Sequence, residues 1–240
     1  MVIRVSASWC GIKDSKFASF LKDKFGEEFD TEKIKEIDCH FKDISDLSGI
    51  EHFPNLEKLD CSMNKLTSLN VRNNLKLKHL CCSDNQIKEL NISTLSNLEE
   101  LLCSVNQLEN LDVRHNRQLT FLGCGRNKLT TLDVSNNSVL SQLTCVYNKL
   151  SSIDLSKNSL LQVVDCGYNQ ITSLDISKNP SLQWLACGYN RLSLLDLSYN
   201  RNLITLYCSN NLLRKLIVHK DMPLNDLTVS EYSNIIQYVI

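Results

Sequence analysis

The chain has 240 residues, of which 42% are hydrophobic and 22% charged, and its formal net charge at pH 7 is −1. This composition predicts a soluble globular protein. Lysine and arginine are spread along the sequence rather than clustered, which disfavours nucleic-acid binding. No run of about 18 apolar residues occurs, so we expect no insertion into a membrane.

Residues 1–13 are too short and too polar for a secretion signal. If Met1 is the natural start, this predicts a cytoplasmic protein. If a signal has been removed upstream, the alternative is a secreted or cell-surface protein. The eleven cysteines do not suggest a disulfide framework, because most of them belong to a regular repeat, and reduced thiols suit a cytoplasm.

A helix is expected next. Asp14 can cap its start, Gly26 suits its end, and four apolar residues fall on one face, namely Phe17, Phe20, Leu21 and Phe25. The repeats that follow, described below, predict a solenoid, and the first turn of a solenoid would expose its core without a cover. We therefore interpret residues 1–33 as an N-terminal helical cap. A partner-binding amphipathic helix is the alternative.

Residues 34–223 repeat with a period of 21 residues, as one irregular unit followed by eight regular units. The cysteines of the regular units are Cys61, Cys82, Cys103, Cys124, Cys145, Cys166, Cys187 and Cys208. Three residues after each comes an asparagine, at Asn64, Asn85, Asn106, Asn127, Asn148, Asn169, Asn190 and Asn211. A fixed period of this length predicts a solenoid.

Each unit reads L-x-x-L-x-C-x-x-N-x-L, with the alternation of a strand that has one buried face. Stacked units would form a parallel sheet. We interpret the cysteine column as core packing, because stacked thiols point the same way and do not converge on a disulfide or a metal. The asparagine column is interpreted as a structural ladder that bonds its own turn and the neighbouring turn.

The second half of each unit echoes the first. It carries a second asparagine column at Asn74, Asn116, Asn137, Asn158, Asn179 and Asn200, broken near Leu95. It also carries an aspartate column at Asp112, Asp133, Asp154, Asp175 and Asp196. Helical spacing is missing, so extended segments are expected on this side. We interpret the aspartates as a solvated face, with a cation ladder as the alternative.

These units resemble the leucine-rich-repeat family in its cysteine-ladder form, the bacterial internalin J type, and its nested-half subclass. The resemblance covers residues 34–232. It implies a right-handed coil with a parallel β-sheet on the concave face and short extended segments on the convex face. It also implies binding without catalysis or a cofactor. The chain departs from internalins in showing no signal peptide, immunoglobulin-like domain or wall anchor.

Residues 224–240 are predicted to form a degenerate repeat and cap. Leu224, Leu227 and Val229 begin a ninth unit, and Tyr232 stands where asparagine is expected. The apolar residues from Ile235 to Ile240 would then close the stack. A dimerisation edge is the alternative, although we expect a monomer.

The outward positions of the strands predict a binding site. Its aromatic residues are Phe121, Tyr147, Tyr168, Trp184, Tyr189 and Tyr207. Tyrosine and tryptophan are enriched at binding hot spots, so we expect a protein partner, from a host or a cell surface. Alternatives are a glycan-binding adhesin, a secreted effector or toxin-neutralising protein, and a tyrosine column that only stacks on itself.

Catalysis is not expected. His79, Cys81 and Asp84 superficially suggest a nucleophile and its base. However, side chains two apart on a strand lie roughly 6–7 Å from each other, beyond hydrogen-bond reach. No enzyme motif occurs. His40 and His52 are interpreted as surface histidines, and we expect no metal site.

Overall fold

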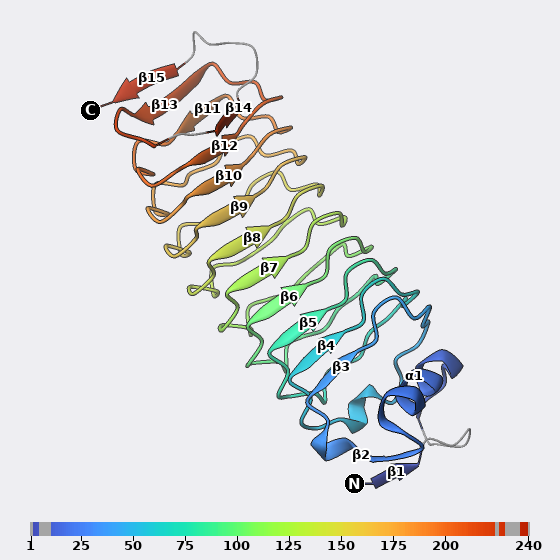
Figure 1. Cartoon of the computed structure of the whole chain (residues 1–240). Helices are drawn as coiled ribbons and strands as arrows, with labels where there is room; N and C mark the ends of the chain where they lie inside the picture. The colour runs from blue at the N-terminus through green and yellow to red at the C-terminus, as the bar shows by residue number, and fades with distance from the viewer. Residues whose placement is uncertain (1, 5–10, 224–225, 229–235, 240) are drawn as a thin grey trace.

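The computed structural model describes residues 2–4, 11–223, 226–228 and 236–239. It is an elongated coil with the N-terminal and C-terminal segments at opposite ends (Figure 1). One wall of the coil is a ten-stranded parallel sheet in the order β14-β12-β10-β9-β8-β7-β6-β5-β4-β3. Neighbouring strands pair at equivalent repeat positions, as Leu143 does with Val164. The predicted parallel solenoid is confirmed.

Each strand of this sheet is three residues long. The strands are β3 (Glu36–Asp38), β4 (Lys58–Asp60), β5 (His79–Cys81), β6 (Glu100–Leu102), β7 (Phe121–Gly123), β8 (Gln142–Thr144), β9 (Val163–Asp165), β10 (Trp184–Ala186), β12 (Thr205–Tyr207) and β14 (Asp226–Thr228). The middle residue is buried in every strand from β3 to β12 of this sheet, and the first and third residues face outward. We call the outward residues of β3–β10 and β12 the sheet surface.

The opposite wall is extended, as predicted. Toward the C-terminal end it forms a second parallel sheet of β11 (Leu194–Asp196), β13 (Lys215–His219) and β15 (Ile236–Val239). In an earlier turn a single bridge joins Leu69 to Leu90. Residues 53–223, all described, contain no helix.

The N-terminal helix α1 (Ser15–Phe25) forms where the sequence predicts it. Asp14 Oδ1 accepts hydrogen bonds from the N–H groups of Lys16 and Phe17, and Gly26 ends the helix with a φ of 91°. Asp14 Oδ2 also accepts bonds from the N–H and hydroxyl of Ser45, which fixes the helix start against the irregular first turn.

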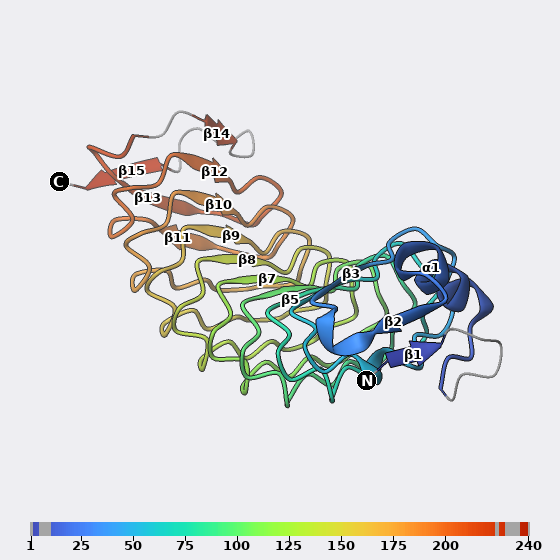
Figure 2. The same ribbon diagram turned by 60° about the horizontal axis from the view of Figure 1, so that its bottom comes forward.

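Two short strands and two short 3-10 helices complete this end of the molecule (Figure 2). They are β1 (Val2–Arg4), which pairs antiparallel with β2 (Glu28–Asp30), and the helices η1 (Thr31–Lys33) and η2 (Ile50–His52). Phe17 and Leu21 of α1 are fully buried in the same core as the repeats. No helix in the described part of the chain is long and apolar enough to span a membrane.

The cysteine column points inward along its whole length. All eight regular members, and Cys39 one row earlier, are fully buried. Burial raises the pKa of each of these thiols, to about 12 at Cys39 and Cys124. The thiols therefore stay neutral and pack as small apolar groups, as predicted.

The first asparagine column ties each turn to its neighbour. In Asn148, Nδ2 donates to the carbonyl of Cys145 in its own turn (3.0 Å) and to that of Cys124 in the preceding turn (3.1 Å). Its Oδ1 accepts from the backbone N–H of Leu129 at 3.0 Å. The pattern repeats from Asn64 to Asn211. The predicted structural ladder is confirmed.

The second asparagine column is satisfied only in part, which the sequence analysis did not anticipate. Nδ2 of Asn158 donates to the carbonyls of Val134 (3.0 Å) and Asn137 (2.9 Å). Its Oδ1 is buried and has no hydrogen-bond partner among the described residues, and the same holds for the other five members of the column. Two nearby backbone N–H groups bond within the turn instead, from Asn158 N–H to the Leu155 carbonyl and from Leu161 N–H to the Asn158 carbonyl.

The C-terminal segment extends the coil. β14 continues the ten-stranded sheet in the register predicted for a ninth unit, with Leu227 beside Leu206, and β15 continues the second sheet beside β13. The predictions for Leu224, Val229, Tyr232, Ile235 and Ile240 lie outside the described residues.

The two ladders predict different costs of losing an amide. Asn148→Ala removes three hydrogen bonds and should lower the free energy of unfolding by about 3 kcal/mol. Asn158→Ala removes two bonds together with an oxygen whose desolvation is uncompensated, so it should cost about 1–2 kcal/mol. Urea unfolding followed by circular dichroism measures both. Equal costs, or the reverse order, would contradict the hydrogen-bond pattern.

Candidate functional site

The sheet surface changes character along the coil. Its N-terminal part is charged, and several of its side chains have polar partners. His79 Nδ1 lies 2.9 Å from Glu100 Oε2 on the neighbouring strand, and Asp60 Oδ1 accepts bonds from the N–H and hydroxyl of Ser62. From β7 onward the surface carries aromatic residues. Phe121, Trp184 and Tyr207 lie on this second part, and Tyr147, Tyr168 and Tyr189 lie just after the ends of its strands.

Three of the predicted residues, Tyr147, Tyr168 and Tyr189, form a stack that we call the tyrosine ladder. Ring centroids of successive members are 4.0 Å apart, and the ring planes differ by 14° and 11°. The Arg126 guanidinium continues the stack, 4.5 Å from the ring centroid of Tyr147. Bonds between the hydroxyls of the ladder raise the pKa of Tyr168. The exposed fractions are 39%, 37% and 47%, so the ring edges face solvent.

The tyrosine ladder occupies an unfavourable backbone position. The residue before each first-column asparagine has a φ of 51–56°, in the left-handed region. For residues other than glycine this costs about 1–2 kcal/mol, and Asn or Asp tolerate it best. Ring stacking returns about 0.5–1.5 kcal/mol per pair. Two ring pairs therefore do not outweigh the cost at three tyrosines.

The other three predicted residues lie on the strands. Trp184 and Tyr207 form an edge-on pair with centroids 5.9 Å apart and planes at 63°. Phe121 begins β7 and is separated from Trp184 by the strands β8 and β9. All three side chains are half-buried. The six predicted residues thus form the tyrosine ladder, the Trp184–Tyr207 pair and a separate Phe121, rather than one cluster.

Asp165 is a feature of this surface that the sequence analysis missed. It ends β9, and its Oδ1 accepts one hydrogen bond, from the N–H of Gly167 at 3.0 Å. Burial raises the pKa of its carboxyl, although the Gly167 bond acts in the opposite direction. The sequence could have identified it by position, because Asp165 is the only carboxylate on the sheet surface from β7 to β12.

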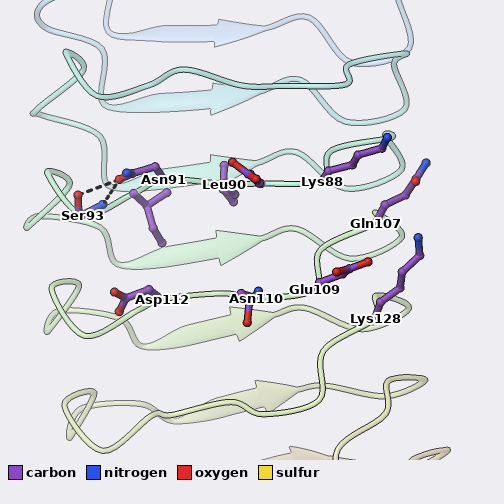
Figure 3. Close-up of a pocket in the computed structure, with 11 residues that line it drawn as sticks. Lys88, Leu90, Asn91, Ser93, Gln107, Glu109, Asn110, Asp112 and Lys128 are labelled. Atoms are coloured by element: carbon purple, nitrogen blue, oxygen red, sulfur yellow. Dashed lines mark hydrogen bonds between the residues drawn. The ribbon is translucent and has the colours of Figure 1, made fainter.

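The other side of the coil carries a broad hollow of about 770 Å³, lined by residues of three successive turns (Figure 3). Lys88, Gln107 and Lys128 extend outward along one edge, and Asn91 and Asp112 mark the other edge. Its lining is mainly long charged or polar side chains, and it lies away from all six predicted residues. It has no apolar anchor for a partner.

The aspartate column on this side has a local explanation. The carboxylates of Asp133, Asp154, Asp175 and Asp196 each accept the N–H of the serine two residues later, and Asp112 accepts that of Arg114. These bonds relieve the repulsion between stacked carboxylates, as the interpretation of a solvated face requires. With its Arg114 bond, the pKa of Asp112 falls to about 2.

One mixed group could approach a metal. Asp38, His40 and Asp60 place one ligand atom each within 4.8 Å of one another. However, His40 Nδ1 is 2.6 Å from Asp38 Oδ1, and this bond raises the pKa of His40. The His40 ring is thus already hydrogen-bonded to the Asp38 carboxylate. The expectation of no metal site stays a prediction.

His79 and Cys81, which superficially suggest a base and a nucleophile, have separate surroundings, and the expectation of no catalysis stays a prediction. His79 turns toward Glu100 on β6, and the Cys81 thiol is partly buried on β5. Burial raises the pKa of Cys81, which disfavours the nucleophilic thiolate.

Similarity to known proteins now identifies the fold. No protein-family model matches the chain, and no curated protein matches it. Among solved structures, the functional domain of InlJ from Listeria monocytogenes, which includes a cysteine ladder, matches 96% of this chain at 28% identity and a TM-score of 0.75. The fold is that of a leucine-rich-repeat protein of the cysteine-ladder type.

Two further structures support the leucine-rich-repeat fold. A leucine-rich-repeat protein of Leptospira interrogans matches 79% of the chain at 25% identity, with a TM-score of 0.63. The ectodomain of the receptor kinase GASSHO1/SCHENGEN3 from Arabidopsis thaliana matches 75% of the chain and 24% of its own length, at 20% identity and a TM-score of 0.64. The chain spans 62% of the InlJ structure and 57% of the Leptospira structure.

The backbone position of the tyrosine ladder generates a stability prediction. Val105 has the same left-handed conformation, where a β-branched residue is particularly unfavourable, and Asn210 occupies the equivalent place in a later turn. Val105→Asn should raise the free energy of unfolding by about 1 kcal/mol, measured by urea unfolding. Val146→Asn, at a position without positive φ, is the control and should bring no gain. A loss of stability in Val105→Asn would be contrary to this account.

The cysteines should react unequally with iodoacetamide. In the native protein we expect modification of Cys81, and modification of the nine described ladder cysteines only after unfolding. Because burial raises the pKa of Cys81, its rate should still increase above the ordinary thiol pKa of about 8.5. Peptide mass spectrometry across a pH series measures each site. Native ladder cysteines that react as fast as Cys81 would disprove the inward column.

Proposed function

We propose that this leucine-rich-repeat protein binds a protein partner through its sheet surface and the adjoining tyrosine ladder, without catalysing a reaction. The residues that would contact the partner are Phe121, Tyr147, Tyr168, Trp184, Tyr189 and Tyr207. The observation that carries the proposal is a row of half-exposed aromatic side chains on a coil whose backbone is fixed by two asparagine ladders.

The energetics support a role beyond packing. Aromatic side chains bury a large area with few rotatable bonds, which is why they dominate binding hot spots. A surface fixed in advance loses little conformational entropy on binding. Repeat solenoids present extended binding surfaces, and this agrees with a binding role.

A protein partner is favoured over a glycan by the way the rings are stacked. Sugar rings stack on open aromatic faces, but both faces of Tyr168 are covered by its neighbours, and Arg126 covers the outer face of Tyr147. The ladder offers ring edges and hydroxyls instead. These suit the mixed apolar and hydrogen-bonding contacts of a protein surface.

Affinity capture with matched variants tests the proposal. Wild type, Trp184→Ala, Tyr168→Ala and Tyr199→Ala serve as baits, and captured proteins are quantified by mass spectrometry. Tyr199 is 65% exposed and lies beside Asp196 on the opposite side of the coil, so its variant is the control. We expect Trp184→Ala to weaken capture about 30-fold, the effect of a hot spot, and Tyr199→Ala to leave it unchanged.

Thermal melting of all four proteins accompanies the capture, because a fold lost in the variants would imitate lost binding. Capture that persists in both Trp184→Ala and Tyr168→Ala would refute the site. A glycan array provides the other arm, since glycan signals lost in Trp184→Ala and kept in Tyr199→Ala would replace the protein partner by a carbohydrate.

A further inference from the structure

The sheet surface has its own charge balance, which differs from that of the whole chain. Five of its residues are acidic and one is a lysine, so its formal charge is −4, whereas the chain as a whole carries −1. The acidic residues are Glu36, Asp38, Asp60, Glu100 and Asp165, and the lysine is Lys58. An electronegative surface of this kind attracts a basic partner.

Asp165 differs from the other four acids. Its cross-strand neighbours, Thr144 and Ala186, are uncharged, and its side chain is half-buried. None of the ion pairs in the described part of the chain involves it. No cation contributes to its raised pKa, which results from burial. A half-buried carboxylate without a counter-ion is costly, and a cation brought by a partner would relieve this cost.

A purely structural role does not account for Asp165. Its bond to the Gly167 N–H closes the turn after β9. Yet Thr144, Ala186 and Tyr207 occupy the same register position on the neighbouring strands, and their turns close with the same first-column asparagine bonds. The turn therefore does not require a carboxylate at this position.

The neighbours of Asp165 form a niche suited to a long basic side chain. Ala186 on β10 pairs with Asp165, and its small side chain leaves space next to the carboxylate. Tyr207 on β12, which is in contact with Trp184, bounds this space on the far side. At a strand spacing of about 4.8 Å, the backbones of Asp165 and Tyr207 are roughly 10 Å apart. A cation paired with the carboxylate can then lie within about 6 Å of an aromatic ring.

We propose that the partner inserts an arginine or lysine side chain between the Asp165 carboxylate and the Trp184–Tyr207 pair. This inference rests on the proposed function, because it specifies the chemistry that the sheet surface recognises. Arginine fits best, since its planar guanidinium pairs with a carboxylate and stacks on aromatic rings at the same time. A bound metal ion fits poorly, because the adjacent positions hold Thr144 and Ala186 and supply no further carboxylate.

A phage-displayed random peptide library, selected on the full chain, tests the proposal. Peptides enriched on the wild type are expected to share an arginine or lysine beside apolar residues. The best peptide is then synthesised with its basic residue as arginine or as citrulline, which keeps the shape and removes the charge. Both peptides are titrated against wild type, Asp165→Asn and Asp175→Asn by isothermal calorimetry.

Asp165→Asn keeps an oxygen that can accept the Gly167 N–H and removes only the charge. Asp175→Asn makes the same change on the opposite side of the coil, where the carboxylate caps Ser177. We expect Asp165→Asn or citrulline each to weaken binding about tenfold to hundredfold, and the two changes together to cost little more than either alone. Asp175→Asn should leave binding unchanged.

Equal losses in Asp165→Asn and Asp175→Asn, additive effects of Asp165→Asn and citrulline, or enriched peptides without a basic residue would each overturn the inference. In those cases the proposed function survives if peptide binding still requires Trp184. If no peptide is enriched, the inference is overturned as well. Peptides that bind equally well to Trp184→Ala and Tyr168→Ala would count against the proposed function itself.

Discussion

The fold depends on a side-chain amide that bonds two turns at once. Nδ2 of Asn148 bridges carbonyl groups of successive turns, and its Oδ1 holds a backbone N–H of the preceding turn. A buried amide is stabilising only when its groups are bonded, so each turn must reproduce the same backbone path as the turn before it. This requirement keeps the strands in register and the period at 21 residues.

The same geometry determines what the surface can present. To bring the asparagine inward, the preceding residue adopts a positive φ and its side chain faces outward. Three successive tyrosines at this position stack at 4.0 Å, and the strand residues Trp184, Asp165 and Tyr207 lie beside them on the same rigid sheet. The buried residues are nearly the same in every repeat, whereas the outward residues differ. The surface can therefore carry varied chemical groups while the backbone stays the same.

Much of the fold was predictable because burial leaves a periodic signal. The inward cysteines, the two asparagine columns and the capped helix at Asp14 all follow from spacing and side-chain chemistry, and the structure confirms them. The unpartnered Oδ1 atoms of the second column were not predictable, because they depend on which backbone N–H groups are already bonded within each turn.

The candidate site was predictable as a set of outward residues but not as an arrangement. The spacing of Phe121 and Trp184 already places them three turns apart, but it does not show that the rings of Trp184 and Tyr207 meet edge-on. Nor does it reveal that Asp165 lacks a cation, since that depends on where every lysine and arginine side chain ends. Charge along one surface is a property of the folded chain, and here it is more negative than the composition suggests.

Amide hydrogen exchange measured residue by residue tests the central claim most directly. The N–H groups of Leu108, Leu129, Leu150 and Leu192 each bond to the Oδ1 of an asparagine in the following turn. If the ladder holds the coil together, these amides exchange only through opening of the coil and are protected as strongly as those of the sheet. Exchange at the rate of an unstructured peptide at these four positions, in a protein whose sheet amides are protected, would contradict it.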